Sequence, residues 1–159
     1  MSGQTQTGLL HGDADVAWVR FLRAHAAITR ELSARLEAGH GLTLSDFDVL
    51  VQLYHAPGHS LRRVDIARAV LLTASGITRL LDGLERAGWV EKRSCDTDAR
   101  VSYAVLTKAG LEKFEAARVA HHGDIAELFG SRFSAEERTQ IAELLGRLPL
   151  AETSPSCSV

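Results

Sequence analysis

The stretch from Thr73 to Gly110 constrains the fold most strongly, because its pattern predicts an amphipathic helix followed at once by a charged hairpin. Thr73 can cap this helix, since its hydroxyl can accept a hydrogen bond from a backbone N–H group of the first turn. Apolar residues at three- and four-residue spacing form one helix face: Ile77, Leu80, Leu81 and Leu84. Ala87-Gly88 then ends the helix. Few other architectures need a helix and a charged hairpin in this order.

The hairpin is predicted over residues 89–106. An extended run opens at Trp89-Val90 and continues through three charged residues before a turn at residues 94–98. The chain then returns over residues 100–106 with residue types that alternate with period two, as expected for a half-buried strand. This region therefore predicts two antiparallel strands next to the helix.

A shorter helix is predicted just before this stretch, over Arg62–Val70. Its small residues Ala67 and Ala69 would permit close helix packing, and Leu71-Leu72 would join it to the following helix. Two helices joined by a turn of a few residues form a helix–turn–helix, whose second helix enters the major groove of DNA. With the hairpin, the pattern predicts a winged helix–turn–helix. The alternative is a helical hairpin packed for stability alone, which does not account for the charged hairpin.

Helical patterns flank this unit on both sides. The helix before it ends at residues 39–41, Gly-His-Gly, and three later helix starts have residues that can cap them: Thr43 with Asp46, Thr107, and Ser134 with Glu137. The predicted fold class is mainly α with a small β-hairpin wing. The predicted organisation is a flexible N-terminus (1–13), a single domain (14–148) with a winged helix–turn–helix (about 43–106) between dimerisation helices (about 14–38 and 107–148), and a disordered tail (149–159).

The composition indicates a single domain that does not span a membrane. With 159 residues and 45% hydrophobic content, the chain suits one domain with an ordinary core. No segment approaches about 18 uninterrupted apolar residues, and residues 1–16 lack the basic and apolar parts of a secretory signal. Cys95 and Cys157 are the only cysteines, which excludes a disulfide framework. We therefore expect a cytoplasmic protein.

The charge is distributed unevenly, although its net value is only −2. Residues 60–108 hold nine basic and six acidic residues and carry +3, so the remainder of the chain carries −5. This asymmetry directs negatively charged phosphate toward the middle of the chain. Because the basic residues fall on the predicted helices and hairpin, we expect double-stranded DNA as a partner.

The order of elements and two motifs resemble the MarR family of bacterial transcription regulators. The first motif is SGITRLLDGLERAGWVEKR, over residues 75–93. The second joins Asp98-Ala99-Arg100 to Leu106–Gly110, and it matches the family's wing pattern of Asp-x-Arg, six residues, Thr, two residues and Gly. The resemblance covers roughly residues 14–148. Many members have a second arginine at the position of Ala99, so the resemblance implies a slightly weaker wing contact here.

The resemblance implies a division of roles at the DNA. The wing arginine, here Arg100, would enter the minor groove, where negative potential favours a guanidinium. Asp98 would pair with Arg100 and fix its direction rather than contact DNA. Arg79 is the best candidate for guanine, because its fork matches O6 and N7. The other candidate DNA contacts are Ser75 and Thr78 on the second helix, Lys92 and Arg93 on the wing, and Arg62 and Arg63 on the helix before.

The first helix and the last two have apolar faces that a thin winged-helix core cannot cover. Their most economical cover is the same helices of a second copy, so we expect a homodimer. Two-fold symmetry also matches a palindromic operator whose half-sites lie about one helical turn apart.

The resemblance further implies a repressor released from DNA by a small aromatic or anionic molecule, such as an aromatic acid or a phenol. Such molecules generally bind between the dimerisation helices and the winged helix in this family. The matching residues are Trp18, Phe21, Leu22 and His25 on the first helix and Asp48, Gln52 and Tyr54 on the second. Plain packing is the alternative for the apolar residues, an interface hydrogen bond for His25, and a cap or an arginine pair for Asp48.

The sequence also contains residues that could serve other kinds of regulation. Cys95 lies near Arg93 and Arg100, which could favour a reactive thiolate for oxidant sensing, whereas an exposed thiol without a role is the alternative. Imidazoles for zinc are available at His40, His55, His59, His121 and His122, although the last two point to different faces of a helix. A winged helix can also act as a protein-interaction module without DNA. We expect no enzyme activity, cofactor or metal site, since no catalytic motif, phosphate loop or metal signature occurs.

Overall fold

The computed structural model describes residues 12–70, 74–95, 98 and 100–148. The elements are, in chain order, α1 (Asp13–His40), α2 (Leu44–His55), η1 (Pro57–His59), β1 (Ser60–Arg62), α3 (Arg63–Ala69), α4 (Ala74–Arg86), β2 (Val90–Ser94), β3 (Ser102–Leu106), α5 (Lys108–Leu128), η2 (Gly130–Arg132) and α6 (Ala135–Leu145). The predictions for the N-terminus up to residue 11, for Leu71-Leu72 and Thr73, and for the tail lie outside the described residues.

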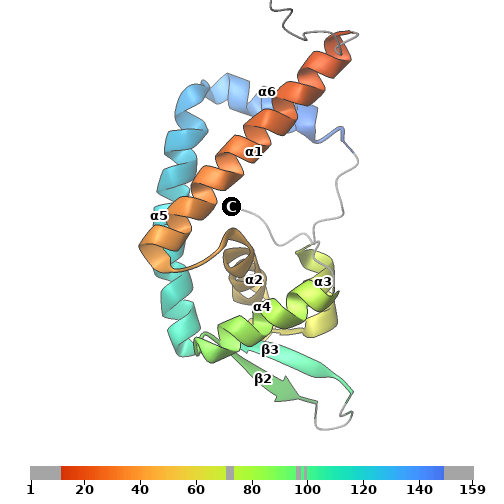
Figure 1. Ribbon diagram of the computed structural model, residues 1–159, viewed down its shortest axis with the longest axis vertical. Helices are drawn as coiled ribbons and strands as arrows, with labels where there is room; N and C mark the ends of the chain where they lie inside the picture. The colour runs from red at the N-terminus through yellow and green to blue at the C-terminus, as the bar shows by residue number, and fades with distance from the viewer. Residues whose placement is uncertain (1–11, 71–73, 96–97, 99, 149–159) are drawn as a thin grey trace, which may run out of the picture.

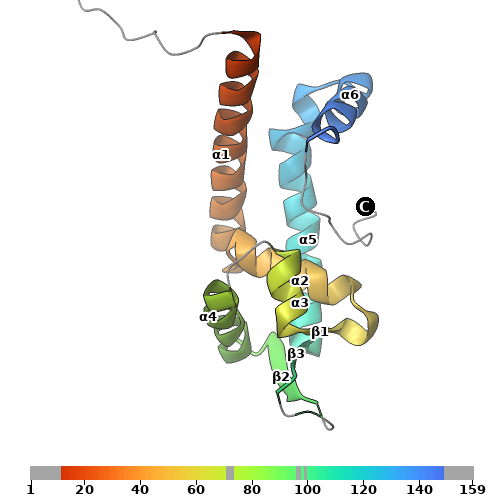
Figure 2. The same ribbon diagram turned by 90° about the vertical axis from the view of Figure 1, so that its right-hand side faces the viewer.

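The molecule has two parts, which Figures 1 and 2 show at opposite ends. The winged lobe consists of α2, α3, α4, the strands and the first half of α5. The helical arm consists of α1, the second half of α5, and α6. In Figure 2, α1 and α5 stand side by side along the arm, and α6 lies at the end of the arm away from the lobe.

The predicted helix ends are set by local hydrogen bonds. Thr43 Oγ1 accepts a hydrogen bond from the backbone N–H of Asp46 (3.1 Å), and the Asp46 carboxylate accepts one from the N–H of Thr43 (2.9 Å). This capping box starts α2. The caps predicted at Thr107 and at Ser134 with Glu137 are also present. Gly41 ends α1 with φ of 63°, a left-handed conformation that favours glycine.

The wing sheet has three strands, whereas the sequence predicted a two-stranded hairpin. β1 and β2 each pair antiparallel with β3, so the strand order is β1-β3-β2. Arg62 therefore ends a strand, and the helix predicted to begin there begins at Arg63. The central position of β3 also explains why Ala104, Val105 and Leu106 are buried in succession, without the predicted alternation. With three residues, β1 is too short to show a period-two pattern.

The lobe encloses a hydrophobic core around α2. Val49, Leu50 and Leu53 of α2 are fully buried. The core is completed from the other lobe elements by Ile66, Val70, Ile77, Leu81, Leu84, Val90, Ala104, Leu106, Phe114 and Ala117. The predicted apolar face of α4 is confirmed, with Leu80 packed at the edge of the core. Val51 and Tyr54 of α2 pack against the edge of this core and are only partly buried.

The arm is held together along one line of contact between α1 and α5. Leu32 and Leu36 are the buried residues of α1. One turn away, the Arg35 guanidinium donates to Asp124 Oδ1 (2.9 Å) and to both carboxylate oxygens of Glu127 (3.0 and 3.1 Å). These hydrogen bonds from Arg35 lower the pKa of Glu127.

Most apolar side chains elsewhere on the arm are exposed to solvent. Trp18 is 57% exposed and Leu144 is 55% exposed. The exposed apolar residues of the arm are Trp18, Phe21, Leu22, Val119, Ile125, Leu144, Leu145 and, just after α6, Leu148. None of the described helices has the length and apolar content of a membrane span.

Candidate nucleic-acid interface and ligand pocket

α4 presents a polar face on the side opposite the core. Thr78 and Arg79 are exposed on this face, whereas Ile77 and Leu81 are buried beneath it. Ser75 lies in the first turn of α4, and its side chain is outside the part of the structure that can be described. α4 is the second helix of the helix–turn–helix, so its exposed side chains are available to the edges of bases in a groove.

Arg100 is exposed at the end of the wing, just before β3. The Asp98 carboxylate accepts a hydrogen bond from the backbone N–H of Arg100 (2.9 Å), and the carbonyl of Asp98 accepts one from Val101 (3.0 Å). The predicted ion pair between Asp98 and the guanidinium of Arg100 is not formed in the structure. Instead, Asp98 holds the backbone of the turn, so any effect on the direction of Arg100 acts through that backbone.

The predicted basic contacts divide into paired and unpaired cations. The paired ones are Arg93 with Glu91 (2.6 Å), Arg62 with Asp65 (2.7 Å), and Arg63 with Asp82 (3.5 Å) and Glu85 (3.9 Å). Arg79, Lys92 and Arg100, the unpaired cations, are exposed and form no ion pair with any described residue. An exposed ion pair contributes only about 0–1 kcal/mol, so phosphate can compete for Arg62 and Arg93, whose side chains are 50% and 66% exposed, at small cost. The unpaired cations can bind phosphate without that cost.

α3 and the wing meet at a basic hollow of about 320 Å³. Three of the predicted DNA contacts line it together: Arg62, Arg63 and Arg100. Because these side chains come from β1, α3 and the turn before β3, the unpredicted strand is what brings them together. The hollow suits a phosphate group of a nucleic-acid backbone.

The wing is fixed to the first turn of α5. Thr107 Oγ1 donates to the carbonyl of Gly88 (2.7 Å), and the backbone N–H of Thr107 donates to the carbonyl of Trp89 (3.1 Å). A Cβ atom on Gly110 would overlap the Trp89 carbonyl oxygen. The Lys113 ammonium lies 4.9 Å from the centre of the Trp89 ring. These contacts explain why the wing pattern contains Thr and Gly. The only sign of them in the sequence was a glycine inside a predicted helix, where glycine is otherwise unfavourable.

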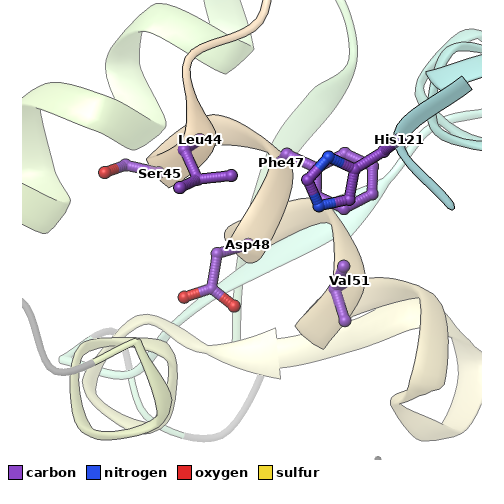
Figure 3. A pocket seen from close by; sticks show the side chains of 6 residues that line it. All are labelled: Leu44, Ser45, Phe47, Asp48, Val51 and His121. Carbon is purple, nitrogen blue, oxygen red and sulfur yellow. The ribbon is translucent and has the colours of Figure 1, made fainter. Parts of the chain in front are cut away.

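A pocket of about 410 Å³ lies where α2 meets α5 (Figure 3). Its lining residues are Leu44, Ser45, Phe47, Asp48, Val51 and His121. The rings of Phe47 and His121 lie 4.7 Å apart and form one wall. Burial raises the pKa of Asp48, although a hydrogen bond from Gln52 opposes this effect. Burial, together with the neighbouring His122, lowers the pKa of His121.

The pocket contains only one of the residues predicted for a ligand site, Asp48. Gln52 contacts Asp48 (3.5 Å) and lines a smaller neighbouring hollow instead. Tyr54 packs against Phe114, with ring centres 4.8 Å apart, and belongs to the edge of the core. Trp18, Phe21, Leu22 and His25 lie on the exposed N-terminal half of α1. At about 1.5 Å per residue, Trp18 is about 34 Å along α1 from Gly41. Within one chain, these residues do not join Asp48.

Among the pocket residues that were not predicted for a ligand site, His121 is the one that α5 contributes, and it had been considered only for zinc. Its spacing from Phe114 and Ala117 puts it on the buried face of α5, and its side chain is 8% exposed. A histidine on an apolar helix face was the available signal. Cys95 is partly buried at the end of β2. Among the described residues, no three His, Cys, Asp or Glu side chains come together as a metal site.

Comparisons with known proteins agree with this arrangement. Residues 40–101 match a model of the MarR family. The transcriptional repressor YetL of Bacillus subtilis (strain 168) is 33% identical over 111 residues, which are 70% of this chain and 66% of YetL. The transcriptional regulator MhqR of the same organism is 30% identical over 128 residues, which are 80% of this chain and 86% of MhqR.

A solved structure shows the same fold. Sco3205 from Streptomyces coelicolor, a MarR family transcriptional regulator crystallised in complex with DNA, superimposes with a TM-score of 0.81 at 23% identity. The match covers 86% of this chain and 89% of Sco3205. The predicted fold class, mainly α with a winged helix–turn–helix and terminal helices, is thereby confirmed. The chain belongs to the MarR family of DNA-binding, winged helix–turn–helix transcription regulators, a family that is not enzymatic.

Proposed function

We propose that this chain is a dimeric, sequence-specific repressor that a small molecule releases from a palindromic operator. The observation that carries the proposal is the position of the unpaired cations, Arg79 on α4 and Lys92 and Arg100 on the wing. In our proposal α4 enters the major groove with Thr78 and Arg79, and Arg100 enters the adjacent minor groove. Lys92 and the paired arginines contact phosphates on either side.

The homodimer is proposed from the exposed apolar residues of the arm. Burial of one such side chain contributes about 1.5–3 kcal/mol, so several together offset the cost of association, about 4–15 kcal/mol. We assign Trp18, Phe21 and Leu22 to this interface, with His25 at its edge, rather than to a ligand wall within one chain. Two-fold pairing of the arms would present two copies of α4 to two half-sites.

Regulation is proposed to act at the pocket between α2 and α5. α2 belongs to the lobe core and α5 continues into the arm, so a ligand between them can change the angle between lobe and arm. The half-sites of an operator are at a fixed spacing, so such a change would disturb both DNA contacts together. A ligand that binds free protein better than DNA-bound protein must lower DNA affinity by the same factor.

The DNA contact is tested with Arg100→Ala. Operator affinity should fall by about 1–3 kcal/mol, because the variant loses an ordered guanidinium in the groove. Fluorescence anisotropy with labelled operator measures this change, and Arg30→Ala, which removes an exposed arginine from the arm, is the matched control. Asp98→Ala should give a smaller loss than Arg100→Ala. Unchanged affinity in a folded Arg100→Ala dimer would remove this residue from the mechanism.

The operator itself is obtained by sequencing DNA fragments that the purified protein selects from a random pool. An enriched palindrome supports the proposal. If no sequence is enriched, the chain is better described as a winged-helix protein-interaction module.

A further inference from the structure

The pocket between α2 and α5 has an unusual balance of charge for a ligand site. Its lining contains one carboxylate, Asp48, and no lysine or arginine. Leu44, Asp48 and Val51 follow one face of α2 in Figure 3, and His121 reaches across from α5 to overlap Phe47. Three apolar side chains, the Ser45 hydroxyl and the His121 ring therefore surround a single acidic group.

His121 cannot supply the missing positive charge at neutral pH. Its ring is almost completely buried, and its Nδ1 atom has no hydrogen-bond partner in the described part of the chain. A proton on both ring nitrogens would make the ring a buried cation whose Nδ1–H has no acceptor, which is unfavourable. The neutral ring instead extends the aromatic wall formed by Phe47.

We propose that this pocket binds a small organic ammonium ion and rejects carboxylates. The apolar body of the ligand packs on Leu44, Phe47 and Val51, and its ammonium group donates to the carboxylate of Asp48. This inference rests on the proposed function only for the effect of binding on DNA. It replaces the aromatic acid expected from the family resemblance with a ligand of opposite charge.

The physical reason lies in the cost of placing each charge in the pocket. A carboxylate would lie beside Asp48 without a cation in the lining, so both like-charge repulsion and the loss of hydration oppose it. An ammonium relieves the partial burial of the Asp48 carboxylate through a charge-assisted hydrogen bond. The adjacent aromatic ring faces favour the same positive charge.

Three probes test the charge selectivity: benzylammonium, benzyl alcohol and benzoate. They share one ring and a one-carbon substituent but carry positive, zero and negative charge at pH 7. Isothermal titration calorimetry with the full chain, in the absence of DNA, should rank them in that order of affinity. Benzylammonium should bind at least about tenfold more tightly than benzoate.

Asp48→Asn keeps the size of the side chain but removes its charge. It should weaken benzylammonium binding by about tenfold or more and change benzyl alcohol binding little. Glu112→Gln is the matched control, because it neutralises an exposed acid on α5 outside the pocket and should leave all three affinities unchanged. Circular dichroism verifies that both variants are folded.

The inference is overturned if benzoate binds as tightly as benzylammonium, if Asp48→Asn leaves benzylammonium affinity unchanged, or if none of the probes binds. The Arg100→Ala variant should still bind benzylammonium, so a failure of the DNA proposal does not affect this test. Operator release by benzylammonium is measured separately by anisotropy. Binding through Asp48 without release would support the ligand class assigned to the pocket and refute its role as the regulatory site.

Discussion

The winged lobe and the helical arm both have apolar helix faces, but only the lobe covers its own. Val49 and Leu53 at the centre of the lobe are fully buried, whereas Trp18 and Leu144 on the arm are more than half exposed. In the lobe, residues distant in sequence close a single core. In the arm, α1 and α5 share one line of contact, and α6 has no buried residue. The lobe therefore holds α4 and the wing in place through its own core, whereas the apolar faces of the arm are covered by a second copy in our proposal.

The largest effect should come from charging the arm. Leu144→Glu combined with Leu148→Glu would place two carboxylates at the proposed dimer interface, each without a partner. We expect dimerisation to weaken by about 4 kcal/mol or more, roughly a thousandfold, as measured by sedimentation equilibrium. Val64→Glu is the matched control, because Val64 is 51% exposed on α3 of the lobe and should leave the dimer intact. A fully dimeric double variant would show that the arm is covered in some other way.

A smaller effect is expected on folding stability when either of two glycines of α5 is replaced with alanine, and the two changes should have opposite signs. Gly110→Ala would overlap the Trp89 carbonyl at the joint between wing and α5, and should destabilise the protein by about 1–3 kcal/mol. Gly123→Ala has open space around its new methyl group and should stabilise α5 by about 0.5–1 kcal/mol. Urea unfolding followed by circular dichroism measures both. Changes of the same sign would mean that the joint adapts more readily than its close contact indicates.

The smallest effect should be on how the folding stability depends on pH, through His121 at the boundary between lobe and arm. Because burial lowers the pKa of His121, this ring binds a proton at a higher pH in the unfolded chain than in the folded protein. The contribution of His121 to stability is therefore complete above about pH 6.5 and is lost as the pH falls from there through its folded pKa. Asp48, whose pKa is raised by burial, acts in the opposite direction, because its contribution is lost as the pH rises through its folded pKa.

His121→Gln should make the stability curve flatter below about pH 6.5 than in the unmodified protein. The neighbouring His122 is exposed and acts on His121 only through its charge, so His122→Gln should change the curve less than His121→Gln does. An unaltered slope in the His121 variant would show that this ring is not the group that titrates.

Features fixed by neighbours in the chain were predictable from the sequence. The capping residues Thr43 and Ser134 and the buried face of α4 depend on contacts within three or four residues, and the structure confirms them. The family and the fold class followed from the motif around Arg100, and the comparisons confirm both. The residues proposed to contact DNA and ligand remain predictions.

Features that depend on distant contacts were missed. β1 exists because it pairs with β3, some 40 residues later, and its three residues have no pattern of their own. Asp98 was expected to pair with a side chain, but the turn brings it to a backbone N–H group. The pocket arises because His121 of α5 meets Phe47 of α2, a contact that neither helix indicates alone. Conversely, Trp18 and Asp48 were grouped from the family resemblance, and α1 carries Trp18 away from the pocket.

α5 connects these observations mechanically, since it starts at the wing and ends in the arm as one unbroken helix. Its 21 residues span about 31 Å. A rotation of about 6° around one end would displace the other by about 3 Å, the length of a hydrogen bond. The pocket with His121 lies along this lever, between its two ends. In the regulation that we propose, a ligand therefore needs to change this angle by only a few degrees, because the length of α5 converts that change into a displacement as long as a hydrogen bond.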